Sequence, residues 1–409
     1  MYSERRLRVL TIDEEAPWPL TSGKRIRTWN LLRRLATRHE LSFLCYAPVS
    51  ADAVSAFESA GIRLRFVPQL APDRGICLYG RLLVNCLSSL PYSVSKHYTR
   101  RFQEYLQSWL SHDQFDLLHC EWTPYMSYAE SVRQPVVVSA HNIECQILSR
   151  HAEHAPSLLA RRFFRMQAQK MERFERKSFS AADMVLAVSQ ADCSQAQNFG
   201  ARRVRVVDNG VDLDYFLPMH VSERCEVVFI GSLDWRPNRD AVTAFFRDVL
   251  PLLRQKHDDV MVTIVGRRPP ADFTDHIRET PGVELIADAS DVRPYLARAA
   301  VVAVPLRVGG GTRIKILEAL AMKKAVVSTS VGAEGLATTD QHDICIADSP
   351  LSFAEQTSRL LCNPEERQRL GANGRSLVEK RYSWDGIADV MEQAWLEAVG
   401  VPVGMAVSR

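Results

Sequence analysis

Short runs of apolar residues alternate with longer amphipathic segments along the first half of the chain. Each run is too short to form a helix by itself, and several are rich in β-branched residues. This pattern predicts buried parallel strands joined by helical crossovers. A helix is expected from Lys24, directly after the first run. The predicted strands lie at residues 7–12, 40–47, 64–68, 115–120, 135–142, 183–189 and 204–212.

A proline and a polar stretch break this rhythm at residues 215–226, and a second series of apolar runs follows. Two consecutive strand–helix series predict two doubly wound α/β domains. We expect an N-terminal domain at 1–216, a linker at 217–226 and a C-terminal domain at 227–382. The strands of the second series are predicted at 227–233, 260–266, 283–288, 299–306 and 324–332.

The last segment, 383–409, opens with a strongly amphipathic stretch that predicts a terminal packing helix. Ser383 can cap this helix, because a serine oxygen accepts a hydrogen bond from the first free backbone N–H groups. The apolar residues at helical spacing form one face. They are Ile387, Val390, Met391, Trp395 and Leu396.

Composition agrees with a two-domain globular protein. The chain has 409 residues, and single cores rarely grow beyond about 250–300 residues. With 46% hydrophobic and 24% charged residues, disorder is excluded, and the net charge of +3 does not indicate nucleic-acid binding. Nine scattered cysteines without C-x-x-C spacing predict reduced structural thiols, not disulfides or a zinc site.

The first residues indicate a strand and not a signal peptide, and no apolar run reaches the ~18 residues of a membrane helix. We therefore expect a cytoplasmic protein. Contact with a membrane surface stays open.

The strongest chemical signal follows the predicted strand that ends at Leu306. Gly309, Gly310 and Gly311 precede Thr312, and a helical pattern then begins. Glycines let a ligand approach the backbone closely, and the N–H groups at a helix start favour a phosphate. An ordinary strand–helix turn is the alternative reading.

Three charged residues belong to the same segment. Arg313 and Lys315 would add positive charge beside the anion site. Glu318 lies just inside the helix, where its carboxylate could accept hydrogen bonds from two neighbouring hydroxyl groups of a ribose. It could also be an exposed helix residue.

Residues 303–336 resemble the donor motif of glycosyltransferase family 4, which usually has two glutamates separated by seven residues. The second glutamate matches Glu318 and binds the nucleotide ribose in that family. The first matches Gly310, so this carboxylate is absent, and backbone N–H groups of residues 310–312 could take over part of its role. The glycine-triplet form is similar to sugar transferases of bacterial exopolysaccharide clusters.

The loop at 229–242 departs from the family pattern. The family often has an arginine directly after the glycine that matches Gly231, and a lysine a few residues later. Ser232 and Pro237 stand at these places. We hypothesise that Arg236 and Arg313 supply the positive charge that stabilises the leaving diphosphate. A surface cation before a proline is the alternative for Arg236.

On the N-terminal side, the strand within 136–144 brings His141 and Asn142 to its carboxyl end, which faces the ligand crevice in open α/β sheets. The family has a histidine here that contacts the donor sugar, so the resemblance implies this role for His141. The alternative is a histidine with a purely structural role. Glu144 is expected to start a helix or to add a polar contact. His119 ends the preceding strand as a cleft wall or core residue.

Two further loops resemble the family. Its loop after the first strand is glycine-rich and approaches the donor phosphate and the acceptor. The resemblance therefore implies that Gly23 lies near the donor phosphate and the acceptor, and it gives weaker support for the same position of Arg27. Asn209 and Gly210 match an end-of-domain motif and suggest a turn beside the cleft.

Residues 24–38 and 161–177 are strongly basic, and the second stretch interleaves its cations with aromatic residues. A basic amphipathic helix could rest on anionic lipid, which would suit an acceptor carried on a polyprenyl diphosphate. The alternative is a solvated helix face over a core.

The resemblance implies the GT-B fold, with two facing Rossmann-like domains and a final helix that crosses back to the first. It implies that a sugar is transferred from a nucleotide sugar to a glycan or lipid-linked acceptor in polysaccharide biosynthesis. The transfer would be retaining and metal-independent, and the nucleotide sugar would be a substrate, with no further cofactor. A nucleotide-sugar 2-epimerase and a non-catalytic binding module are the alternatives. No nucleic-acid partner is expected.

Overall fold

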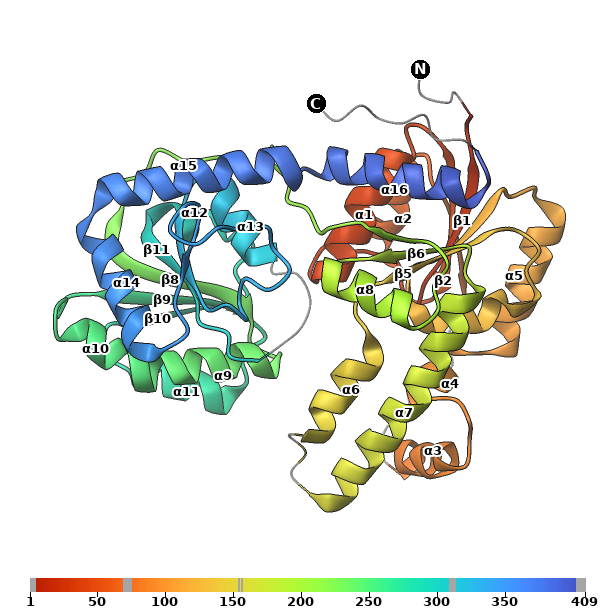
Figure 1. Ribbon diagram of the computed structural model, residues 1–409, viewed down its shortest axis with the longest axis horizontal. Helices are drawn as coiled ribbons and strands as arrows, with labels where there is room; N and C mark the ends of the chain where they lie inside the picture. Colours follow the sequence, from red (N-terminus) through yellow and green to blue (C-terminus); the bar gives the residue numbers. More distant parts are fainter. Residues whose placement is uncertain (1–4, 69–75, 154, 156, 309–313, 402–409) are drawn as a thin grey trace. The chain divides into compact units, whose positions relative to one another are not determined.

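The computed structural model describes residues 5–68, 76–153, 155, 157–308 and 314–401 (Figure 1). These residues form two compact units. The first contains the chain up to Asp208 together with the residues from Ile387 on, and the second is Asn209–Gly386. Each unit is built on a parallel sheet, which confirms the predicted pair of doubly wound α/β domains.

The sheet of the first unit has seven strands in the order β3-β2-β1-β4-β5-β6-β7, and all neighbouring strands run parallel. The order reverses beside β1, so the carboxyl ends of β1 and β4 mark the position where such sheets bind ligands. The strands are β1 (Arg8–Ile12), β2 (Glu40–Tyr46), β3 (Arg63–Val67), β4 (Leu117–Cys120), β5 (Val136–Ala140), β6 (Met184–Ala187) and β7 (Val204–Val206).

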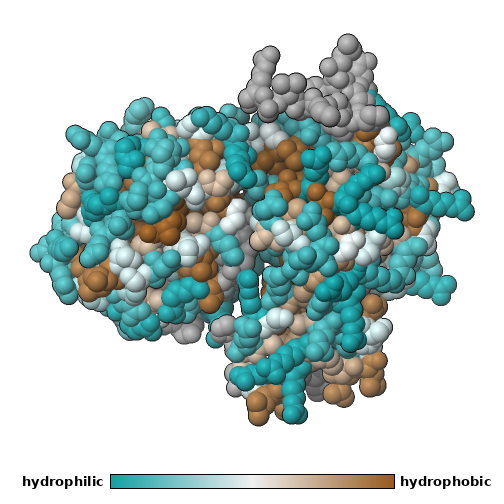
Figure 2. All heavy atoms as spheres, viewed as in Figure 1, coloured by the Kyte–Doolittle hydropathy of each residue, from teal (hydrophilic) through white to brown (hydrophobic). Residues whose placement is uncertain are grey.

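Helices cover both faces of this sheet, and α6 and α7 form a pair that extends away from it (Figure 1). Hydrophobic residues gather at the free end of this pair and on α3 (Figure 2). The helices are α1 (Gly23–Leu35), α2 (Ala51–Ser59), α3 (Ile76–Cys86), α4 (Tyr92–His97), α5 (Arg100–His112), the 3-10 helix η1 (Thr123–Ser131), α6 (Glu144–Glu153), α7 (Leu158–Ala181) and α8 (Gln190–Asn198).

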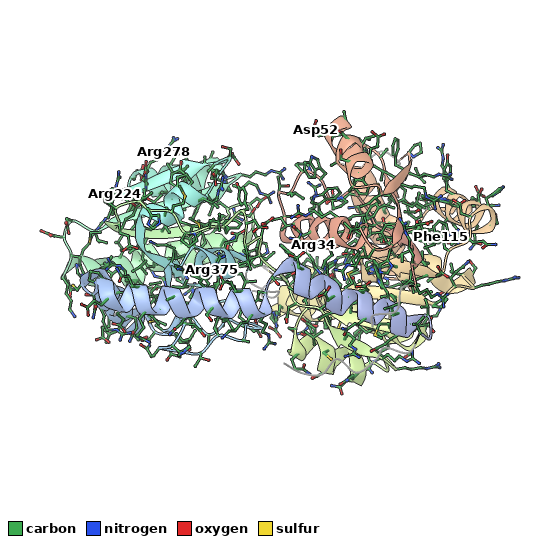
Figure 3. All side chains as sticks on the ribbon, turned by 90° about the horizontal axis from the view of Figure 1, so that it is seen from above. Arg34, Asp52, Phe115, Arg224, Arg278 and Arg375 are labelled. Atoms are coloured by element: carbon green, nitrogen blue, oxygen red, sulfur yellow. The ribbon has the colours of Figure 1, made fainter. Side chains whose placement is uncertain are left out.

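The terminal helix α16 (Trp384–Ala398) packs into the first unit through its residues from Ile387 on. Trp395 is fully buried, and its ring lies 5.7 Å from that of His119. Arg38, in the turn after α1, pairs with Asp389 at 2.7 Å and also with Glu392. Figure 3 shows α16 lying over α1, on which Arg34 is labelled. The last helix therefore completes the core of the first unit.

The sheet of the second unit has six parallel strands in the order β10-β9-β8-β11-β12-β13. Its strands are β8 (Arg224–Ser232), β9 (Met261–Arg267), β10 (Val283–Ala287), β11 (Ala299–Val304), β12 (Ala325–Ser328) and β13 (Cys345–Ile346). Its helices are α9 (Arg236–Ala244), a π-helical stretch η2 (Phe245–Val249), α10 (Leu250–Arg254), α11 (Ala271–Arg278), α12 (Arg293–Arg298), α13 (Ile314–Ala321), α14 (Pro350–Cys362) and α15 (Pro364–Arg381).

Residues 209–216, which we expected to close the N-terminal domain, group instead with the second unit. The reason is local pairing: the N–H of Val211 donates to the carbonyl of Tyr382 at 2.9 Å, and the side chain of Phe216 joins the apolar core of this unit. The other limits of the domains and of the linker stay predictions.

Close packing of α15 fixes the position of α13. Gly371 of α15 lies against the turn after α13, where a Cβ atom at this position would lie 2.0 Å from the carbonyl oxygen of Lys323. Gly374 lies one turn on, and a Cβ atom there would meet the Leu320 side chain at 2.5 Å. Glycine is therefore needed at both places for the helices to approach, which holds α13 firmly on the sheet.

Candidate functional site

In the second unit, five of the expected donor-binding residues lie outside the described residues. They are Gly309, Gly310, Gly311, Thr312 and Arg313. The description resumes with α13, which carries Lys315 and Glu318.

Glu318 is half-buried on α13. Burial raises the pKa of its carboxyl group to about 7, and the positive charge of Lys315 opposes this rise only in part. No hydrogen bond or ion pair to its carboxylate occurs within the part of the chain that the structure describes. A half-buried carboxylate without a donor is ready to accept hydrogen bonds from ligand hydroxyl groups.

Lys315 reaches from α13 over the carboxyl end of β8. Its Nζ donates to Asn238 Oδ1 at 2.9 Å and lies 4.5 Å from the centre of the Phe229 ring. Asn238 in turn donates to the Ser232 carbonyl at 2.8 Å. A Cβ atom on Gly231 would lie 2.8 Å from both Lys315 Nζ and Asn238 Nδ2, so a larger residue here would displace these two groups. The ammonium group is thus fixed at the carboxyl end of the central strand.

Arg236 is the first residue of α9, and its side chain is exposed. Its guanidinium has no ion-pair partner among the residues that the structure describes. A cation at a helix start and a second cation on α13 can attract a phosphate group, and the N–H groups of the helix start add to this attraction. Asn238 was missed in the sequence analysis, although its position two residues after Arg236 could have drawn attention to it.

In the first unit, two histidines and one glutamate meet at the carboxyl ends of β4 and β5. His141 Nε2 lies 3.4 Å from Glu121 Oε1, and His119 Nε2 lies 3.4 Å from Glu121 Oε2. His119 is fully buried and shares a hydrogen bond of 2.9 Å with Ser139 Oγ. Thr28 Oγ1 of α1 donates to Glu121 Oε1 at 2.8 Å. Sequence reasoning missed Glu121, which directly follows the strand that carries His119.

The charges of this cluster are set by burial and by neighbouring cations. Burial opposes ionisation of Glu121, but the nearby His141 nitrogen and the positive charges that His119, His141 and Arg27 can carry lower its pKa to about 2. Burial lowers the pKa of His119 to about 4 and also lowers that of His141. At neutral pH, an ionised Glu121 therefore faces neutral imidazoles.

His141 itself is almost buried, with a side chain 11% exposed. Its Nε2 has no hydrogen-bond partner with good geometry among the described residues. Nε2 is shielded from solvent and faces the Glu121 carboxylate, so the other ring nitrogen, Nδ1, is the one left for a ligand hydroxyl group at the carboxyl end of the strand.

A second buried polar group adjoins the first strand. Lys24 of α1 donates to Asp13 at 2.7 Å and to Glu14 at 3.1 Å, and its Nζ lies 5.1 Å from the centre of the Trp122 ring. Burial raises the pKa of Asp13 to about 7, even though Lys24 opposes this rise. Trp122 Nε1 also donates to Glu144 at 2.9 Å, so Glu144 both starts α6 and makes a polar contact.

The remaining expected cleft residues are dispersed. Gly23 begins α1 and is exposed, and Asn142 is half-buried directly after His141. Arg27 is buried and donates to the Asp208 carbonyl at 2.6 Å, while burial lowers its pKa to about 10. Asn209 is buried in the segment that joins the second unit.

The basic stretch 24–38 is not an open lipid-binding face. Arg27 is buried, Arg25 pairs with Glu15, and Arg38 pairs with acids of α16. These arginines therefore interact mainly with groups of the first unit.

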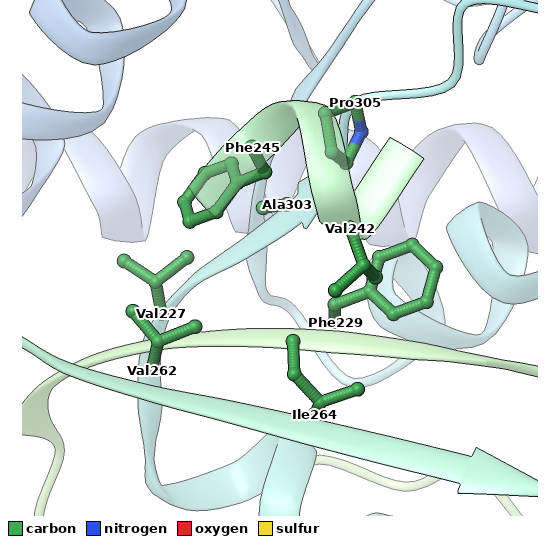
Figure 4. Close-up of a pocket in the computed structure, with 8 residues that line it drawn as sticks. All are labelled: Val227, Phe229, Val242, Phe245, Val262, Ile264, Ala303 and Pro305. Atoms are coloured by element: carbon green, nitrogen blue, oxygen red, sulfur yellow. The ribbon is translucent and has the colours of Figure 1, made fainter. Parts of the chain in front are cut away.

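A small cavity in the second unit does not belong to this polar chemistry. It measures about 10 Å³ and is lined by apolar side chains of β8, β9 and the neighbouring helical segments (Figure 4). This volume is near the minimum for one water molecule, so the cavity is a packing void and not a nucleotide site.

Comparison with known proteins shows two family models along the chain. The model described as Glycosyltransferase Family 4 matches residues 22–215, and the model described as Glycosyl transferases group 1 matches residues 224–363. Together they cover both units.

Curated relatives match over part of their length. A mannosyltransferase of Mycobacterium tuberculosis, named as GDP-mannose-dependent alpha-(1-6)-phosphatidylinositol monomannoside mannosyltransferase, is 28% identical over 52% of this chain and 61% of its own. The D-inositol 3-phosphate glycosyltransferase of Salinispora tropica is 30% identical over 48% of this chain and 46% of its own length. An uncharacterized protein in the cps region of Klebsiella pneumoniae is 24% identical over 39% of this chain and 42% of its own length. The alignments thus span about half the length of these relatives.

Solved structures agree on the fold. Anabaena Alr3699/HepE, solved in complex with UDP and glucose, has a TM-score of 0.67 and 13% identity, with 96% of this chain and 100% of that chain covered. The structure named TarM has a TM-score of 0.68 and 10% identity, with 97% of this chain and 99% of that chain covered. With two parallel-sheet units and both family models matched in order, the chain belongs to glycosyltransferase family 4 and has the GT-B fold.

Proposed function

We propose that the protein transfers a sugar from a nucleotide-diphosphate sugar to a glycan or a lipid-linked acceptor in polysaccharide biosynthesis. The reaction keeps the configuration of the anomeric carbon, as expected for family 4, and needs no metal ion. It takes place in the cytoplasm, where a polyprenyl-diphosphate acceptor is reached at the membrane surface.

The observation that carries this proposal is the arrangement around α13. Glu318 offers a half-buried carboxylate to which no described residue donates, and Lys315 holds a fixed ammonium group over Gly231. A nucleoside diphosphate presents vicinal ribose hydroxyl groups and two phosphates, which need an acceptor and cations respectively. When the glycosidic bond breaks, negative charge grows on the diphosphate, and preorganised cations such as Lys315 and Arg236 stabilise it.

On the first unit, His141 is the best candidate to bind the transferred sugar. Its imidazole is neutral at pH 7 because burial lowers its pKa, and its Nε2 faces Glu121, which leaves Nδ1 for a ligand. A neutral imidazole can donate to or accept from a sugar hydroxyl group, and Glu121 fixes its orientation from 3.4 Å away.

The choice of donor follows from the relatives. One curated relative is named as GDP-mannose-dependent, and one structure of the same fold was solved with UDP-glucose. A thermal-shift panel should therefore compare GDP, UDP and their sugars, because a ligand that binds the folded state raises its melting temperature. We expect one nucleoside diphosphate to raise it and the others to have little effect.

Turnover of the donor selected in this way then tests the chemistry. We expect His141→Ala to lower turnover by at least about tenfold with little loss of nucleoside diphosphate affinity, since the diphosphate contacts are assigned to the second unit. Lys315→Met should weaken nucleoside diphosphate binding. Lys380→Met, at an exposed position on α15, is the matched control and should change neither.

Three outcomes would overturn parts of the proposal. Conversion of the donor sugar to its epimer without acceptor would indicate an epimerase, and nucleotide binding without turnover would indicate a binding module. Loss of activity with a chelator, restored by a divalent metal, would contradict metal independence. NMR of the anomeric proton of the product decides between retention and inversion.

A further inference from the structure

We propose that the free end of the α6–α7 pair and the adjoining face of α3 form a membrane-docking surface that inserts aliphatic side chains into an anionic lipid bilayer. We call this surface the aliphatic tip. It rests on the proposed function, because it names the surface by which the chain would reach a lipid-linked acceptor, but lipid binding itself would not require sugar transfer. Its residues are Leu83 and Val84 of α3, Leu87 in the turn directly after α3, and Leu158 and Leu159 of α7, which are 75%, 71%, 93%, 74% and 80% exposed.

The first part of the tip is the beginning of α7. This helix has 24 residues from Leu158, but its first buried side chain is that of Gln167. Nine residues at 1.5 Å each therefore extend about 13 Å before the helix enters the fold. Ser157 caps the helix by accepting from the Ala160 N–H at 3.2 Å, so Leu158 and Leu159 lie on ordered helix. They are held out in solvent.

The second part is α3, which α7 holds in a defined orientation. Gln167 Nε2 donates to Asn85 Oδ1 at 2.8 Å, and Lys170 Nζ donates to the Asn85 carbonyl at 2.7 Å. Asn85 is buried against α7. With 100° between successive helix residues, Leu83 lies about 160° away from Asn85 on the helix circumference, so it faces away from the protein. Leu87, in the turn after α3, is 93% exposed. Hydrophobic residues are visible at both parts of the tip in Figure 2.

The charge around the tip selects the kind of partner. No aspartate or glutamate occurs in residues 76–98 or 157–171 of the sequence. The cations in these two segments include Arg81 on α3, and Arg161, Arg162 and Arg165 on the first turns of α7. The end of α6 adds the exposed Arg150 and Glu153, so the rim has an excess of positive charge. This excess complements the negative surface potential of anionic lipids, which attracts basic residues beside an apolar surface.

An apolar centre made of aliphatic side chains favours lipid over protein. The centres of protein–protein interfaces are enriched in aromatic residues and methionine. The exposed residues of the tip are leucine and valine, which suit the acyl-chain boundary of a bilayer. No helix of the described chain is long and apolar enough to cross a membrane, so docking would take place at the surface.

Flotation of the full chain with vesicles tests this surface. We expect the protein to float with vesicles of phosphatidylcholine mixed with phosphatidylglycerol, and far less with phosphatidylcholine alone. Leu158→Ser with Leu159→Ser should lower the partition coefficient at least about tenfold, because two inserted side chains are lost. Leu83→Ser with Leu87→Ser should do the same. Leu351→Ser, at a position 58% exposed on α14, is the matched control and should float like the unaltered protein.

The inference would be overturned by absence of flotation with anionic vesicles or by tip variants that float unchanged. It would also fail if sedimentation velocity showed a dimer that the tip variants convert to monomers, since the tip would then bind a second copy. The melting temperature of each variant checks folding, and we expect no change because the altered side chains are exposed. Nucleoside diphosphate binding is measured on the same samples, and its absence alongside normal flotation would count against the proposed function alone.

Discussion

Replacing Glu318 by glutamine should make the nucleotide-free protein more stable and its nucleotide binding weaker. Burial raises the pKa of Glu318 to about 7 from an ordinary value of 4.5. One pH unit between these values corresponds to about 1.4 kcal/mol, so ionised Glu318 destabilises the fold by about 3 kcal/mol. This cost is absent below pH 4.5, grows as the pH rises to about 7, and is constant above it. Glutamine avoids the charge but still buries an amide, which leaves a gain of about 1–2 kcal/mol.

The assay is thermal melting at about pH 8 with and without the selected nucleoside diphosphate, together with calorimetric titration. Glu318→Gln should melt several degrees higher without ligand. It should bind the nucleotide about tenfold to a hundredfold more weakly, because a charge-assisted hydrogen bond contributes about 1.5–3 kcal/mol. Glu355→Gln, an exposed position on α14, should change neither quantity. A variant that is less stable and binds as tightly as the original would refute the role of Glu318.

Three further changes probe the interior by urea unfolding. Lys24→Met should destabilise the protein by about 3 kcal/mol because it leaves Asp13 buried without its cation, and Asp13→Asn in the same chain should restore part of this loss. Glu121→Gln should destabilise the protein at pH 7, and the difference should shrink as the pH falls from 4.5 to about 2, where the low pKa of Glu121 no longer adds stability. Gly371→Ala should cost about 2 kcal/mol, since its Cβ would overlap the Lys323 carbonyl, and no loss would mean that α15 can shift.

The positions of the strands could be predicted from the sequence because buried parallel strands consist of short runs of apolar residues. All twelve predicted runs contain a strand, and the terminal helix begins at Trp384, next to the expected cap Ser383. The two-residue strand β13 was missed, because so short a segment has no periodicity of its own.

The polar contacts could not be predicted in the same way, since they join residues far apart in sequence. Glu121 matters because β4, β5 and α1 bring His119, His141 and Thr28 to it. The sequence around Glu121 does not indicate that these three residues lie next to its carboxylate. The roles of His141 and Glu318 in binding stay predictions.

The return of α16 to the first unit has a consequence for how the protein is made. A ribosome finishes residues 209–386 before it reaches Ile387, so the second unit can close while the first still lacks a piece of its interior. Until Trp395 arrives, the site beside His119 and His39 stays open to solvent. Maturation of the histidine cluster must then wait for the final stretch of translation, and a chaperone has its longest opportunity to act on the part of the chain that was made first.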